Sequence, residues 1–111
     1  MEAQVGGVLE KFVCFRQDVH RHPELGFKET RTKEVLLDHL KGMGCSNIRE
    51  VAETGIIVDI HGEGEPAATF KVIALRADMD ALPMDEETDV PYSSEKFVVF
   101  ESNLMNSSNT N

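Results

Sequence analysis

The sequence predicts an α/β domain in which helices pack on a mixed sheet. Apolar residues recur every three or four positions over the first 43 residues, which is typical of amphipathic helices. From Thr54 the pattern alternates between apolar and polar residues, and from Phe70 it becomes a nearly continuous apolar run. Both later patterns are typical of strands. Helices followed by strands that need cover favour a layered α/β arrangement.

The first predicted helix covers about residues 4 to 21, where one helical face is apolar. It should end near His20 to His22, because Pro23 forces the residue before it away from helical dihedrals. The stretch HRHPELGF is therefore predicted to be a turn or loop. A second helix is predicted in TRTKEVLLDHLKGMG, with Thr30 as its N-cap and Gly42 and Gly44 as its stop.

Two strands are predicted after the helices, one in TGIIVDIHG (54–62) and one in TFKVIALRA (69–77). The short GEGEP loop between them favours an antiparallel hairpin. CSNIREVAE (45–53) is a weaker candidate for a third strand. The domain is predicted to cover residues 1–94. Residues 95–111 form a divergent tail rich in Ser and Asn, which we expect to be disordered from about residue 102.

Composition limits the classes of function. The chain has 111 residues, 41% of them hydrophobic and 28% charged, which fits one small globular domain. Its net charge of -9 argues against nucleic acid or a membrane surface as a partner. The start MEAQVGGVLEK has neither a basic leader nor a long apolar run, so we expect a soluble, cytoplasmic protein. Cys14 and Cys45 show no metal-binding spacing and are predicted to be buried thiols.

The stretch ALRADMDALP (74–83) contains the strongest candidate site. Asp78 and Asp80 follow an apolar strand two residues apart, so their side chains point the same way if the backbone stays extended. Carboxylates at the carboxyl end of a strand commonly orient a histidine or coordinate a metal. The alternative is that the two aspartates cap a turn that begins at Pro83.

Other motifs are less specific. His20 and His22 do not share a helical face, so they could hold one metal ion only if that segment is extended. Otherwise one packs near the proline turn and the other is solvated. The GEGEP loop does not open a helix, which excludes a phosphate-binding loop. Residues 78–89 fail as a calcium loop because Leu82 and Pro83 occupy ligand and turn positions. The acidic run 85–89 suits either a cation or solvent.

The sequence resembles the peptidase M20 family, in particular its amidohydrolase branch. Five stretches carry the resemblance in order and spacing: RQDVHRHPELGFKE, TRTKEVLLDHLKGMGC, TGIIVDIHG, ALRADMDALP and EETDVPYSS. Together they cover residues 10 to 94. The resemblance implies the amino-terminal part of an M20-type, zinc-exopeptidase-like layered catalytic domain, which would be incomplete at this length.

Family members use one or two zinc or manganese ions to hydrolyse the amide bond of N-acyl amino acids. The resemblance places Asp80 behind the metal and Asp78 beside it. It places the metal ligands and the general-base glutamate beyond the equivalent of Ser94, where this chain has no matching residues. We therefore expect no metal site, and no activity, in this chain alone.

Two further functions stay open from the sequence. The chain could be a non-catalytic interaction protein that docks on a full-length relative through an unpaired sheet edge. It could also be a simple acidic cation-binding module.

Overall fold

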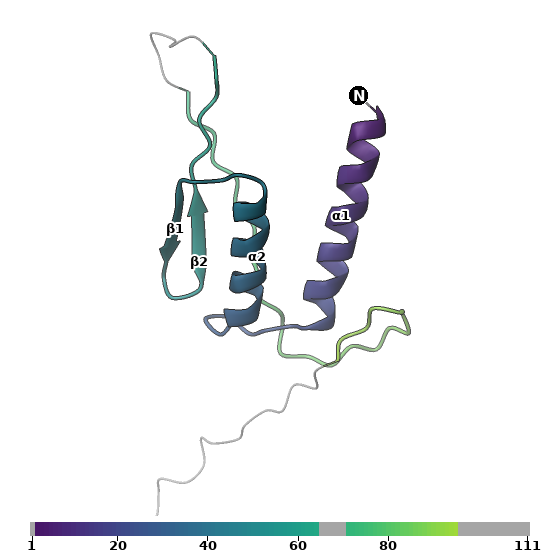
Figure 1. The fold of residues 1–111 in the computed structure, drawn as a ribbon. Helices are drawn as coiled ribbons and strands as arrows, with labels where there is room; N and C mark the ends of the chain where they lie inside the picture. Colours follow the sequence, from purple (N-terminus) through teal and green to yellow (C-terminus); the bar gives the residue numbers. More distant parts are fainter. Residues whose placement is uncertain (1, 65–70, 96–111) are drawn as a thin grey trace, which may run out of the picture. The chain divides into compact units, whose positions relative to one another are not determined.

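The computed structural model describes residues 2–64 and 71–95, with only the backbone for residues 2–5 (Figure 1). The predicted tail from residue 96 onward lies outside the described residues. Four elements follow one another along the chain: α1 (Glu2–Arg21), α2 (Thr30–Gly42), β1 (Ile48–Val51) and β2 (Gly55–Val58). The chain divides into two compact units, residues 1–23 with 82–111 and residues 24–81, which are described separately below.

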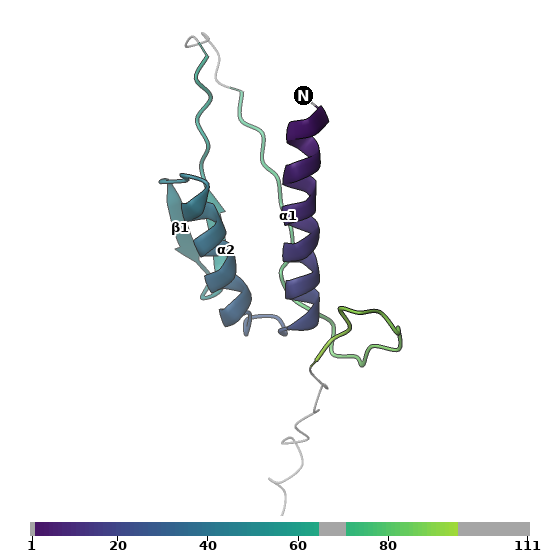
Figure 2. The same cartoon turned by 45° about the vertical axis from the view of Figure 1, so that its right-hand side comes forward.

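Helix α1 confirms the first predicted helix (Figure 2). Its end is formed by the N–H of His22, which donates to the carbonyls of Asp18 and Val19 at 3.2 Å each, immediately before Pro23. The apolar face of this helix is exposed: the exposed fractions of Leu9 and Phe12 are 60% and 53%.

Helix α2 confirms the second predicted helix, with one correction at its start. The N-cap residue is Glu29, not Thr30, and its side chain makes no capping hydrogen bond. The end follows the glycine prediction. Gly44 has a φ of +85°, the N–H of Cys45 donates to the carbonyl of Leu40, and that of Gly44 donates to Lys41, both at 3.0 Å. This pair of bonds is a Schellman motif, which needs a residue with a left-handed backbone.

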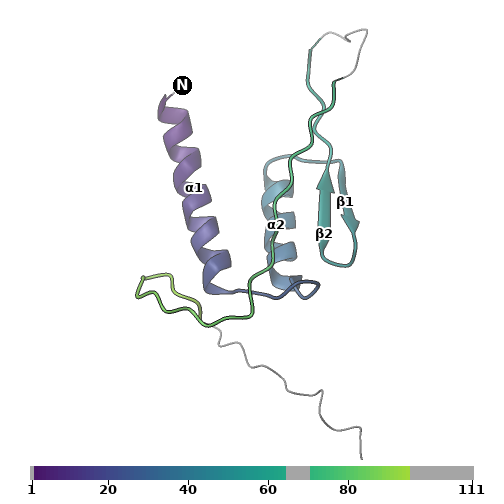
Figure 3. The same cartoon turned by 180° about the vertical axis from the view of Figure 1, so that it is seen from behind.

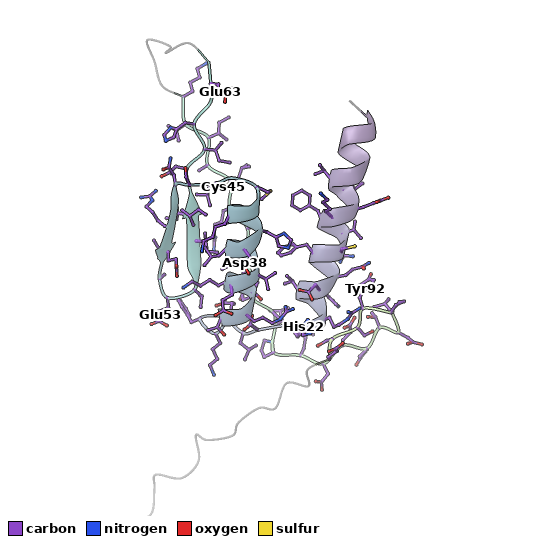
Figure 4. All side chains as sticks on the ribbon, viewed as in Figure 1. His22, Asp38, Cys45, Glu53, Glu63 and Tyr92 are labelled. Atoms are coloured by element: carbon purple, nitrogen blue, oxygen red, sulfur yellow. The ribbon has the colours of Figure 1, made fainter. Side chains whose placement is uncertain are left out.

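The sheet is an antiparallel hairpin of β1 and β2, in the register Ile48↔Val58 and Val51↔Gly55. The predicted pairing of strand 54–62 with 69–77 is therefore wrong, since β2 pairs with the stretch considered the weaker candidate. Gly55 is required at the turn because a Cβ there would lie 2.8 Å from the carbonyl oxygen of Val51. Glu53, labelled in Figure 4, lies in this turn.

Residues 71–77 form no strand, which contradicts the prediction for 69–77; residues 69 and 70 lie outside the described part (Figure 3). Val72, Ile73 and Leu75 are 90%, 86% and 96% exposed. A strand needs a hydrogen-bonding partner. In the described residues β1 and β2 pair only with each other.

The described residues include no buried hydrophobic side chain; the buried residues are polar, namely Glu29, Thr32 and Thr54. The prediction of buried thiols is wrong, because Cys14 is exposed and Cys45 only half-buried. The α/β class is confirmed, since the described residues contain two helices and a two-stranded sheet, and the wider layered fold stays a prediction. No helix in the described part of the chain is long and apolar enough to cross a membrane.

Candidate functional site

Asp78 and Asp80 lie in the irregular segment that ends the unit of residues 24–81. The Asp78 side chain is 69% exposed, and its Oδ1 accepts a hydrogen bond from the guanidinium of Arg76 at 2.8 Å. Arg76 is itself 88% exposed, so this ion pair is worth little in water. Asp80 is exposed and lies against the backbone of Gly26, where a Cβ would be 3.7 Å from its Oδ2.

Glu24 is the residue that organises the loop before α2. Its Oε1 accepts hydrogen bonds from the N–H and the hydroxyl of Thr32, both at 2.7 Å. Its Oε2 accepts the N–H of Arg31 at 3.0 Å and the hydroxyl of Thr30 at 3.3 Å. These backbone groups are among the donors at a helix start that have no partner inside the helix. Glu24 therefore caps α2 from a distance, in the place of the Thr30 cap that the sequence predicts.

The same residue reaches the segment that carries the aspartates. The carbonyl oxygen of Glu24 accepts the N–H of Ala81 at 2.7 Å. Ala81 directly follows Asp80, so the aspartate is held beside the loop by its neighbour's backbone. Within the unit of residues 24–81, the start of the loop before α2 and the end of the aspartate segment, separated in sequence, are thereby brought together.

The other unit has its own cluster, where the loop 82–95 meets the end of α1. The His20 ring lies edge-on to Tyr92 with the ring centroids 5.6 Å apart, and its Nε2 lies 3.0 Å from Oε1 of Glu86. The guanidinium of Arg16 stacks 5.3 Å from the centre of the Tyr92 ring. Figure 4 labels Tyr92 in this loop. These contacts attach the loop to the helix.

His22 has different partners from His20. Its Nδ1 lies 2.9 Å from the carbonyl oxygen of Asp18, and its Nε2 lies 3.7 Å from a carboxylate oxygen of Glu95. The two histidines therefore contact separate groups. Both contacts suit a structural role at the end of α1, which is the non-metal alternative for this pair.

Glu86 has the largest pKa change in the described residues. Hydrogen bonds from the Thr88 hydroxyl, the Ser94 N–H and the His20 ring stabilise its ionised form and lower its pKa from 4.5 to about 2. The side chain is only 16% exposed. Glu86 is thus a carboxylate that fixes the loop 82–95 and stays ionised at neutral pH.

The described residues do not by themselves fit a metal ion. No three His, Cys, Asp or Glu side chains in residues 2–64 and 71–95 are placed to hold one. Asp78 and Asp80 are two carboxylates, whereas catalytic zinc sites usually have three protein ligands that include histidine or cysteine. No catalytic step through a metal is derived for this chain.

Sequence reasoning missed Glu24, Glu86 and Tyr92. Glu24 stands six residues before α2 begins, too far for a local capping pattern. The only available signal was that it stands beside Pro23 in a loop whose backbone groups need partners.

The described residues thus form a small α/β unit with an aspartate pair held by a capped loop, and a helix with an attached loop. Comparison with known proteins finds relatives by sequence. The N-acetyldiaminopimelate deacetylase of Anoxybacillus flavithermus is 45% identical over 84 residues, which are 75% of this chain and 21% of that protein. "Putative amidohydrolase YhaA" of Bacillus subtilis is 38% identical over 91 residues, 82% of this chain and 22% of that protein.

A third relative has a name of another kind. "Putative glutamate--cysteine ligase 2-3" of Rhodococcus jostii is 45% identical over 85 residues, 77% of this chain. Only 10% of that protein is matched. No family model matches the sequence, and no solved structure does.

These matches support the motif resemblance to the amidohydrolases of the peptidase M20 family, of which the chain matches the amino-terminal region. It spans about a fifth of the length of the deacetylase and the amidohydrolase, 21% and 22%.

Proposed function

We propose that the chain is the amino-terminal segment of a metal-dependent amidohydrolase that cleaves the amide bond of N-acyl amino acids, and that it is inactive by itself. The observation that carries the proposal is the 45% identity over 84 residues to a deacetylase. The name of that relative specifies the removal of an acetyl group from an N-acetylated amino acid.

In this proposal Asp80 lies behind the metal of the complete enzyme and Asp78 lies beside it. Zinc or manganese would polarise the amide carbonyl and activate a water molecule there. The described residues of this chain supply position and charge near that centre, not the full set of ligands. The N-acyl amino acid is accordingly a substrate of the complete enzyme only.

A chimera tests the proposal. The matching amino-terminal residues of the Anoxybacillus flavithermus deacetylase are replaced by residues 1–94 of this chain, and hydrolysis of N-acetyldiaminopimelate is measured. We expect an active chimera. Asp80→Ala should lower its activity by about 10- to 100-fold, the usual effect of removing a group that orients metal ligands.

The matched control is Asp38→Ala, which removes an exposed aspartate of α2. It should leave the activity of the chimera unchanged. A folded chimera without activity, or equal activity in the two variants, would contradict the proposal.

A second candidate function is a non-catalytic interaction protein that associates with a full-length relative. The exposed apolar run of Val72, Ile73 and Leu75 favours it, because such residues usually mark a surface that another chain covers. An antibody against HRHPELGFKETRTK separates the two functions in a lysate of cells that express this sequence. A band several times larger than 12.4 kDa supports the enzyme segment, and a single band near 12.4 kDa supports the interaction protein.

A further inference from the structure

Glu24 joins two parts of the unit of residues 24–81 that are far apart in sequence. Its side chain binds the start of α2, and its main chain binds the residue that follows Asp80. We infer that Glu24 is a positioning residue, which holds Asp80 at a fixed place relative to the amino-terminus of α2. The functional meaning of this role rests on the proposed function, in which Asp80 serves a metal centre.

Hydrogen bonds fix the position of the Glu24 carboxylate at the start of α2. A carboxylate has about four acceptor positions on its two oxygens. Here two donors lie on Oε1 and two on Oε2, at distances of 2.7 to 3.3 Å. Thr32, which supplies two of the four, is 2% exposed. The carboxylate is thus held on both sides, and the loop backbone at residue 24 cannot rotate without breaking several of these bonds.

The main-chain half of the link acts on the aspartate segment. The Ala81 N–H donates to the Glu24 carbonyl at 2.7 Å, and the Asp80 carboxylate lies beside Gly26, where a Cβ would be 3.7 Å from its Oδ2. In the described part of this unit, no other backbone hydrogen bond joins residues 71–81 to residues 24–64. Residues 71–77 are exposed and form no strand. The position of Asp80 therefore depends on the backbone of residues 24 to 26.

A simple capping role makes a different prediction from a positioning role. If Glu24 only caps α2, its loss frees the first amides of the helix and leaves the Ala81 amide as it was. If Glu24 also positions Asp80, its loss frees the Ala81 amide as well, although that amide donates to the main-chain carbonyl of Glu24.

Amide hydrogen exchange on the full 111-residue chain, followed by NMR, separates these cases. We compare the wild type with Glu24→Ala and with Glu24→Gln, which keeps one acceptor oxygen. Exchange of the Ala81 amide, taken relative to the amides of β2, should be faster by on the order of tenfold in Glu24→Ala, the size of effect that follows from the loss of a helix cap. Glu24→Gln should lie between Glu24→Ala and the wild type.

The matched control is Glu34→Ala, which removes an exposed glutamate from α2. It should leave the exchange rates of the Arg31, Thr32 and Ala81 amides unchanged. Dividing the exchange rate of the Ala81 amide by the rates of the β2 amides removes the effect of global unfolding. If Glu24→Ala does not fold, Glu24→Gln takes its place in the comparison.

Three results would overturn the inference: an unprotected Ala81 amide in the wild type, faster exchange at Arg31 and Thr32 alone, or an equal change in Glu34→Ala. The measurement involves no metal and no substrate. Its failure is therefore distinct from a failure of the proposed hydrolase function, which the chimera tests.

Discussion

Single carboxylates order the loops of this protein. Glu24 collects four donors at the start of α2, and Glu86 collects donors from Thr88, Ser94 and His20 around the loop 82–95. Ionised acceptors form stronger hydrogen bonds than neutral ones, so one side chain can fix a loop that lacks apolar packing. In both cases at least one of the bonds connects residues that are eight positions apart, Glu24 with Thr32 and Glu86 with Ser94.

Glu86 predicts a pH dependence for the attachment of the loop 82–95 to α1. Its pKa in the folded state is about 2, below the ordinary 4.5, so between these values the unfolded chain binds more protons than the folded chain. The stabilisation is therefore complete above about pH 4.5 and is lost as the pH falls through 2. NMR titration of the Ser94 amide should show this transition.

Substitution gives the control for that titration. Glu86→Gln should remove the transition at Ser94, whereas Glu87→Gln, at the exposed neighbouring position, should keep it. A Ser94 amide that titrates equally in both variants would show that Glu86 does not hold the loop.

At the scale of elements, the helices follow local patterns, whereas the pairing of the strands was mispredicted. β2 has two possible partners in the chain, and it pairs with the one that a turn of three residues connects. Closing a short loop loses less entropy than closing a long one. Two contacts extend the hairpin beyond its four pairs. The Arg49 guanidinium lies 2.9 Å from the Asp59 carboxylate, and the Asp59 N–H donates to the Asn47 carbonyl.

The end of α2 offers a matched pair of glycine substitutions. Gly44 has a φ of +85°, so Gly44→Ala should lower the stability of the helix by about 1 kcal/mol, because alanine disfavours left-handed dihedrals. Gly42 is the last residue of the helix, and a Cβ there would meet open space, so Gly42→Ala should raise the stability by up to about 1 kcal/mol.

Far-UV circular dichroism at increasing urea concentration measures both effects. Helical signal should be lost earlier in Gly44→Ala and later in Gly42→Ala than in the wild type. Changes of the same sign in the two variants would mean that the Schellman motif does not end α2.

At the scale of the whole molecule, the described residues lack an apolar core. No hydrophobic side chain among them is buried, and several large ones, such as Leu75 and Ile73, are almost fully exposed. Burial of apolar area is the main source of folding stability, so polar contacts and ion pairs alone leave little margin.

We therefore predict that the isolated 111-residue chain is marginally stable and binds the dye ANS strongly. Fluorescence of ANS and a thermal scan by circular dichroism measure this. A sharp, cooperative unfolding transition without ANS binding would contradict the prediction.

The isolated chain is also predicted to have no amidase activity. N-acetyl and N-benzoyl amino acids, incubated with the chain and added zinc or manganese, should not be hydrolysed above background, because the described residues do not assemble three ligands at one place. Turnover that survives repurification of the chain and disappears in Asp80→Ala would show the opposite.

The sequence by itself determined the two helices, the strand in 54–62, the loop at HRHPELGF and the family. The helices, the strand and the loop depend on local spacing and on Pro23 and Gly44, and the family depends on five motifs that follow one another in a fixed order. Such patterns act through dihedral preferences and the periodicity of side chains, which neighbouring residues fix.

Only the tertiary structure decided the partner of β2, the irregular course of residues 71–77 and the use of Glu24 as the cap of α2. None of these features follows from the spacing of neighbouring residues alone. Several partners satisfy a strand edge or a helix start equally well in chemical terms, so the choice depends on which one the chain brings within hydrogen-bonding distance. The link from Glu24 to Ala81 is of this kind, and it places Asp80 beside a loop whose sequence gives no sign of the contact.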